Sequence, residues 1–170
     1  MNLEDEIAYD GALFSNVNLD KTRRQGLELE GDWRIVPSVL ARLTYTYTDA
    51  TFREGMYDGK QIPLVPHNKA SARLSWDGNA LGTYTAVVNY VGQQYYSGDF
   101  SNVQNKMSGY TTADFMAGWN FKPWSISARL LNAFDKKYSP YAGYSTFQSD
   151  YYYYPADGRT FLMTASYNFR

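Results

Sequence analysis

The chain contains no cysteine and only one histidine among its 170 residues. Without cysteine it can form no disulfide, no thiolate metal site and no cysteine nucleophile, and a single histidine makes no metal-binding cluster. An excess of charge of either sign is also lacking, because 16 Lys and Arg residues face 17 Asp and Glu residues. No basic field is therefore available to attract nucleic acid, and a nucleic-acid partner is not expected.

Long apolar runs are absent as well, although 44% of the residues are hydrophobic. No segment approaches the roughly 18 consecutive apolar residues that a membrane-spanning helix requires. A strand of a membrane β-barrel needs apolar residues only at every second position, so crossing by strands stays open. Aromatic residues make up 18% of the chain, an abundance that excludes intrinsic disorder.

Apolar and polar residues alternate through most of the chain, which is the pattern of a β-strand with one apolar face. From Val39 to Tyr47 the odd positions are apolar, and the even positions after Leu40 are Arg or Thr. The same period of two predicts strands in six further segments, at 27–35, 70–76, 84–90, 115–121, 124–130 and 161–169. With a weaker stretch from Leu3 to Tyr9, about eight strands are expected.

Short and long connections alternate between these strands. The short ones are 36–37, 77–81 and 122–123, and the long ones are 11–21, 54–67, 96–108 and 135–157. An antiparallel up-and-down sheet places all short turns on one edge and all long loops on the other, as in outer-membrane barrels. The predicted fold is therefore all-β, an antiparallel up-and-down transmembrane β-barrel wall of about eight strands.

The four tryptophans gather at one edge of this predicted wall. Trp33, Trp76 and Trp119 come near the ends of strands that run toward the short turns, and Trp124 begins a strand that leaves one. Tryptophan collects at the level of lipid headgroups, and membrane barrels carry an aromatic girdle at each interface. We therefore expect these four residues to form a membrane-interface girdle against outer-membrane lipid.

Several motifs along the chain point to one family. They are Arg-Gln-Gly-Leu-Glu-Leu-Glu at 24–30, Ile-Pro-Leu-Val-Pro-His-Asn at 62–68, Leu-Asn-Ala-Phe-Asp-Lys-Lys-Tyr at 131–138, Asp-Gly-Arg-Thr at 157–160, and Tyr-Asn-Phe at 167–169. In this order they resemble the carboxyl-terminal part of the barrel of TonB-dependent outer-membrane receptors of the siderophore type. Ala156 departs from the Pro-Gly-Arg pattern of that family.

The resemblance implies a 22-stranded barrel closed by an amino-terminal plug domain. Residues 1–170 would be the carboxyl-terminal portion of that barrel, without the plug, and Met1 to Glu6 do not read as a secretory signal. The implied location is the bacterial outer membrane. The implied partners are a ferric siderophore or similar scarce nutrient, outer-membrane lipid, and TonB through the missing amino-terminal part; no cofactor is implied.

Catalytic groups are not expected. Glu28, Glu30 and Asp32 share the polar face of one strand, and the tight turn that follows would bring Arg42 opposite Asp32 or Glu30. This arrangement predicts an ion pair across two strands rather than acid–base catalysis. Nucleophile-elbow and phosphate-loop motifs are missing, so the chain is not predicted to be an enzyme. His67 is expected to be structural.

The long loops are rich in aromatic residues, which are the candidate ligand contacts. Aromatic rings offer large apolar contact at small entropic cost, and tyrosine hydroxyls can hydrogen-bond a polar chelate. The predicted ligand-binding residues are Tyr57, Tyr95, Tyr96, Phe100, Tyr141, Tyr144 and Phe147, with the tyrosine run at 151–154 beside them. Packing of the loops against one another is the alternative role for the same rings.

Two other architectures remain open from the residues alone. A complete eight-stranded outer-membrane barrel would pair its first strand with its last. A soluble β-sandwich that binds its ligand through exposed aromatics would instead bury one face of each sheet. In that case Val39, Leu43, Leu74 and Met163 would converge on a common dry centre.

Overall fold

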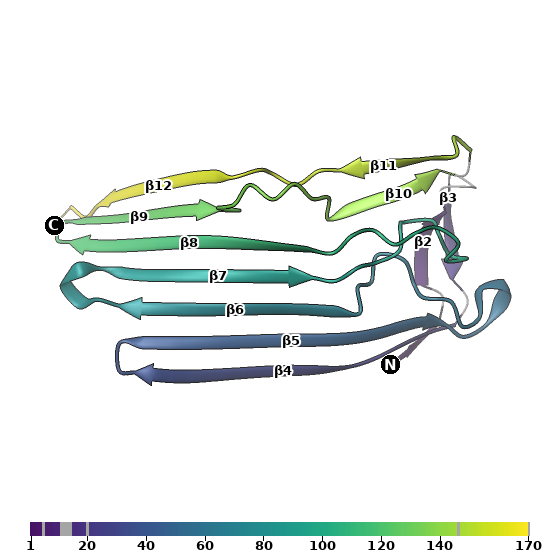
Figure 1. Ribbon diagram of the computed structural model, residues 1–170, viewed down its shortest axis with the longest axis horizontal. Coiled ribbons are helices and arrows are strands. Elements are labelled where there is room, and N and C mark those ends of the chain that lie inside the picture. Colours follow the sequence, from purple (N-terminus) through teal and green to yellow (C-terminus); the bar gives the residue numbers. More distant parts are fainter. Residues whose placement is uncertain (5, 11–14, 20, 146, 170) are drawn as a thin grey trace.

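The main feature of the computed structural model is one eight-stranded antiparallel sheet (Figure 1). The structure describes residues 1–4, 6–10, 15–19, 21–145 and 147–169. In spatial order the strands are β1 (Asn2–Leu3), β4 (Thr22–Val36), β5 (Val39–Phe52), β6 (Asn68–Asp77), β7 (Thr83–Val91), β8 (Tyr110–Phe121), β9 (Trp124–Leu131) and β12 (Thr160–Tyr167). The predicted all-β, up-and-down arrangement is confirmed.

The short turns and the long loops lie at opposite ends of the sheet (Figure 1). The turns after β4, β6 and β8 share one end, which we call the short-turn edge. The other end carries two small hairpins, β2 (Glu6–Asp10) with β3 (Ser15–Leu19) and β10 (Tyr141–Ser145) with β11 (Asp150–Tyr154). Two short 3-10 turns, η1 (Gly55–Tyr57) and η2 (Asn79–Leu81), complete the elements. No helix among the described residues is long and apolar enough to cross a membrane.

The prediction of one opening strand from Leu3 to Tyr9 was wrong. Only Asn2 and Leu3 join the sheet, where they pair with β4, and β2 leaves it to pair with β3. Glu6, the first residue of β2, still contacts β4, because its carboxylate accepts a hydrogen bond from Thr22 Oγ1 and pairs with Arg24 at 2.8 Å. The loop predicted at 11–21 contains β3, while residues 11–14 and 20 lie outside the described part.

The register joins the apolar positions of successive strands into one continuous face. Leu43 lies opposite Gly31 on β4 and Ala72 on β6, Ala72 lies opposite Val88 on β7, and Val88 lies opposite Ala113 on β8. Directly opposed residues of antiparallel strands point to the same side of a sheet. The alternation that each strand shows on its own therefore adds up to one apolar face and one polar face across the wall.

The apolar face has no dry centre. Leu43 and Met163 are each 62% exposed, Leu74 is also exposed, and Val39 is half-buried. A β-sandwich would bury these residues against a second sheet. The structure therefore does not match the sandwich, and it leaves this face to an apolar environment outside the chain.

The sheet is open, with different strands at its two ends. Among the described residues, β12 pairs only with β9, and no rung joins it to β1 or β4. A closed eight-stranded barrel would require such a rung. The arrangement is that of a segment of a wall, and its unpaired edges call for further strands.

Candidate functional site

A bidentate ion pair lies on the polar face near the short-turn edge. Arg42 Nε and Nη2 donate to the two carboxylate oxygens of Asp32 at 2.6 and 2.7 Å, and Glu30 lies 3.7 Å from Arg42. Asp32 is directly opposite Arg42 in the ladder, so the expected cross-strand pair is confirmed and Asp32 is its main partner. Both side chains are about half exposed, so water screens the pair and it adds little to stability. Their role here is to satisfy charge on this face.

The predicted ligand residues Tyr57 and Phe100 belong to a first loop core above β5. The Phe100 ring packs edge-on against Phe52 at 5.8 Å, and Tyr57 lies 5.5 Å from Phe100. Phe100 is 5% exposed, and Leu19 and Ile62 are buried in the same cluster. These rings therefore hold β3 and two long loops against the end of β5.

The predicted residue Tyr96 is the centre of a second loop core. It is 8% exposed and packs with Met107 and Ala142. Its ring lies 4.6 Å from that of Tyr151, and its hydroxyl is 3.2 Å from the hydroxyl of Tyr153. Burial, reinforced by the Tyr153 hydrogen bond, raises the pKa of Tyr96 to about 12. Tyr96 therefore stays a neutral packing residue at physiological pH.

The hairpin β10–β11 sorts its tyrosines onto two faces. The register pairs Ala142 with Tyr153 and Tyr144 with Tyr151, so these share one face, which packs on the second loop core. The opposite face carries Tyr141, Tyr152 and Tyr154 around Gly143. Tyr141 lies 5.3 Å from Tyr154 and donates a hydrogen bond to Ser97 Oγ at 3.0 Å. Of the three tyrosines on this opposite face, Tyr154 is exposed, and Tyr141 and Tyr152 are half-buried.

The remaining predicted ligand residues are more accessible. Tyr95 is half-buried, with the Lys106 ammonium 4.7 Å from its ring centroid. Phe147 is 80% exposed in the tip of the β10–β11 hairpin. The seven predicted residues thus fall into three kinds: buried Tyr96 and Phe100, half-buried Tyr57, Tyr95, Tyr141 and Tyr144, and exposed Phe147. Ligand contact by any of them stays a prediction.

Residues of the motifs at 131–138 and 157–160 hold the connection between β9 and β12 in place through hydrogen bonds. The Asn132 side chain donates to the carbonyls of Lys136 and Asp157 and accepts from the Lys136 amide at 2.9 Å. Asp135 Oδ1 accepts a hydrogen bond from the Arg159 amide, also at 2.9 Å. A methyl group at Gly158 would lie 2.7 Å from that same oxygen. The Asn, Asp and Gly of the two motifs therefore serve one turn structure.

The four tryptophans lie on the apolar face at the short-turn edge. Trp76 stacks on Tyr84 at 5.3 Å, and Trp119 lies edge-on to Tyr84 at 6.1 Å and donates from its Nε1 to the Tyr84 hydroxyl. Trp124 packs edge-on against Tyr167 at 4.9 Å, and Trp33 is exposed on β4. This row of rings has the form expected of the girdle; its contact with lipid headgroups stays a prediction.

His67 is held by its neighbours. Its Nδ1 lies 2.9 Å from the Thr48 carbonyl, its Nε2 contacts the Gln61 amide, and its ring stacks on Tyr47 at 5.8 Å. These contacts agree with the structural role expected of it. The described residues contain no group of three or more His, Asp or Glu side chains that could hold a metal ion.

Comparisons with known proteins agree with this geometry. Residues 1–133 match the family described as TonB dependent receptor-like, beta-barrel. The ferrioxamine B receptor of Salmonella typhimurium is 29% identical over 130 residues, which cover 71% of this chain and 18% of that protein. The iron-regulated outer membrane virulence protein of Vibrio cholerae is 28% identical over 149 residues, covering 86% of this chain and 22% of that protein.

Among solved structures, the ferric yersiniabactin uptake receptor from Yersinia pestis superposes with a TM-score of 0.79 at 26% identity. The match covers 99% of this chain and 26% of that one. This chain therefore spans about a fifth to a quarter of the length of its relatives. The chain belongs to the TonB-dependent receptor β-barrel family, transport receptors of the bacterial outer membrane that are not enzymes.

Proposed function

We propose that this chain is the carboxyl-terminal portion of the barrel of a receptor that binds and imports a ferric siderophore with energy from TonB. The observation that carries the proposal is the open eight-stranded wall, because this chain superposes over 99% of its own length on the ferric yersiniabactin uptake receptor. The ferrioxamine B receptor, another iron-chelate receptor, supports the same cargo class. Contact with TonB would come through parts of the receptor outside these residues.

The loop aromatics supply the ligand surface in this proposal. Tyr57, Tyr95, Tyr141, Tyr144 and Phe147 would contact the chelate, since none of these five residues is buried. Rings that already pack on other loops are held in place, so little entropy is lost when a ligand binds to them. Buried Tyr96 and Phe100 would act by keeping the loops in this arrangement.

Uptake of radioactive iron by a strain that lacks the receptor gene tests the proposal. Complementation should restore uptake of one ferric siderophore from a panel of phenolate, catecholate and hydroxamate chelates. Removal of TonB should abolish that uptake again. Uptake of every ferric chelate at the same rate with and without the gene would refute a ferric siderophore as the cargo. If the strain without the gene instead lost its uptake of cobalamin or a sugar, that compound would replace the siderophore as the proposed cargo.

Single substitutions test the loop residues. Tyr141→Ala and Phe147→Ala should each weaken siderophore binding about tenfold, which corresponds to 1.4 kcal/mol. Phe134→Ala is the matched control, because Phe134 is an exposed aromatic outside the hairpin. If all three substitutions weakened binding equally, or if none of them did, the β10–β11 hairpin would not be part of the ligand surface.

A further inference from the structure

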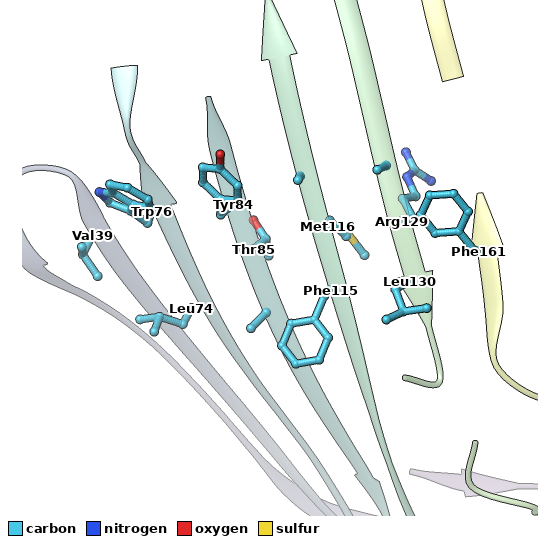
Figure 2. A pocket seen from close by; sticks show the side chains of 13 residues that line it. Val39, Leu74, Trp76, Tyr84, Thr85, Phe115, Met116, Arg129, Leu130 and Phe161 are labelled. Atoms are coloured by element: carbon cyan, nitrogen blue, oxygen red, sulfur yellow. The ribbon is translucent and has the colours of Figure 1, made fainter. Parts of the chain in front are cut away.

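The wall carries hollows of different chemistry. On the apolar face, hydrophobic side chains such as Leu74, Phe115 and Leu130 surround a hollow of about 420 Å³ (Figure 2). This lining does not suit a charged ligand. At the end opposite the short-turn edge, a hollow of about 400 Å³ instead combines aromatic and basic side chains: Tyr96, Tyr110, Tyr138, Tyr153, Lys136 and Lys137. We call this second hollow the lysine pocket.

The lysine pocket lies where β8 begins, beside the connection from β9 to β12. Tyr110 is the first residue of β8, and the alternation of that strand puts its side chain on the polar face with Thr112 and Asp114. Of the seven ligand residues predicted from the sequence, only Tyr96 lines this pocket. The pocket is therefore a separate candidate site on the polar side of the wall.

A stacked pair of tyrosines forms the aromatic part of the pocket. The ring centroids of Tyr110 and Tyr138 lie 4.0 Å apart, and the ring planes differ by 26°. The Ala156 amide donates a hydrogen bond to the Tyr138 carbonyl at 3.0 Å, which joins the two arms of the connection between β9 and β12. Because the two rings are already ordered, another aromatic ring can pack against them at small entropic cost.

Lys136 gives the pocket a positive charge that is not neutralised. The Lys136 amide and carbonyl both bond to the Asn132 side chain at 2.9 Å, so the backbone of Lys136 is held in place. Lys137 pairs with Asp135 at 3.1 Å, whereas Lys136 has no ion-pair partner among the described residues. The described residues that line the pocket include no Asp or Glu. An anionic oxygen would therefore gain a charge-assisted hydrogen bond there.

A larger hollow beside the lysine pocket carries the opposite charge. Tyr110 and Tyr138 also line this space of about 900 Å³, together with Asp114 and Asp157. An anion is favoured near the lysines and disfavoured near these carboxylates. The two hollows share the stacked tyrosines and differ in charge, so an aromatic anion fits the lysine pocket.

We propose that the lysine pocket binds one aryl arm of an anionic ferric chelate whose iron is held by catecholate oxygens. The aryl ring packs against Tyr110 and Tyr138, and the Lys136 ammonium donates to an aryl oxygen. Three catecholate groups leave ferric iron with a net negative charge, whereas three hydroxamate groups leave it neutral and bring no ring. The proposal rests on the proposed function, since it takes a ferric siderophore as the cargo, and it narrows the chemical class of that cargo.

Binding of two matched chelates to the full receptor in detergent tests the proposal. The probes are the ferric complexes of a tris-catecholate and a tris-hydroxamate built on the same tripod, and quenching of tryptophan fluorescence gives their dissociation constants. The wild type should bind the tris-catecholate more tightly. Lys136→Gln should weaken that binding about tenfold, the size of one charge-assisted hydrogen bond, and leave tris-hydroxamate binding unchanged. Lys60→Gln is the matched control, because Lys60 is an exposed lysine of another long loop and does not line the pocket.

Ser108→Trp tests the space inside the pocket. Ser108 is exposed and lines the pocket, so an indole at this position should fill it and weaken tris-catecholate binding by a similar factor. Asn105→Trp is the matched control, since Asn105 is exposed in the same loop but does not line the pocket. Gel mobility before and after heating checks that each variant is folded.

Three results would overturn the proposal. If the wild type bound the tris-hydroxamate as tightly as the tris-catecholate, the catecholate assignment would be wrong, although import of a ferric siderophore would stand. If Lys136→Gln and Lys60→Gln weakened binding equally, or if neither did, the lysine pocket would not be the site. Binding of neither probe would also overturn the proposal, and the uptake assay would then decide separately whether the proposed function fails.

Discussion

Leu43→Arg is the most direct test of the membrane wall. Leu43 is 62% exposed on the apolar face, opposite Gly31 and Ala72, so neither neighbour offers the guanidinium a hydrogen-bond partner from its side chain. If this face meets hydrocarbon, the charge must be moved out of water or must distort the bilayer. If the face meets water, the same substitution should cost almost nothing.

The depth of Leu43 sets the expected magnitude. Val39 is paired with Trp76 of the girdle, and Leu43 is four residues further along β5. At about 3.4 Å per residue and a strand tilt of about 40°, Leu43 stands about 10 Å above the girdle. The apolar band of an outer-membrane barrel is about 25 Å tall, which puts Leu43 near the midplane, where an arginine costs about 2–4 kcal/mol.

Thr44→Arg is the control, because it lies one residue away on the polar face. There it is opposite Glu30 and Ser71, so the new charge gains an acidic neighbour. The free energy of unfolding of the receptor barrel is measured in phospholipid vesicles with guanidinium. Equal losses for the two variants, or a smaller loss for Leu43→Arg, would refute the assignment of the two faces.

Two further predictions concern backbone and pH. Gly26→Ala should destabilise the barrel by about 1–3 kcal/mol, because its methyl group would overlap the Tyr47 carbonyl, whereas Gly31→Ala on the same strand has open space and should be nearly neutral in the same unfolding assay. The Arg159 amide, and next the Lys137 ammonium, hold the pKa of Asp135 below its ordinary value. The ionised carboxylate should therefore stabilise the two ends of the connection between β9 and β12 above the unfolded pKa of about 3.9, and this contribution should be lost as the pH falls through the lower folded pKa. Asp135→Asn should remove that acid-dependent change in proteolysis of the connection, and an unchanged pH profile would contradict the assignment.

The wall could be predicted from the sequence because the patterns that specify it are local along the chain. A period of two places Leu43 and Thr44 on opposite faces whatever lies beside the strand. The alternation of short and long connections then determines which ends of the strands share an edge. The same reasoning placed Trp76 and Trp119 at one rim, and the tight turn after β4 placed Arg42 opposite Asp32. The prediction of one opening strand failed because the alternation there is weak and because β2 pairs with β3, which lies inside a predicted loop.

The packing of the loops could not be predicted in this way, since the loop contacts join residues far apart in the chain. Tyr96 meets Tyr153 across 57 residues, and Gln61 meets Asn102 across 41. By composition alone, Tyr96, Tyr141 and Tyr144 are equivalent candidates. Only the folded arrangement buries Tyr96 and turns Tyr141 and Tyr144 to opposite sides of one hairpin. The sequence by itself determined the wall and its two faces, because strand alternation is a local property. The tertiary structure decided which aromatic rings hold the loops together and which remain accessible, because burial depends on the segments that surround a ring.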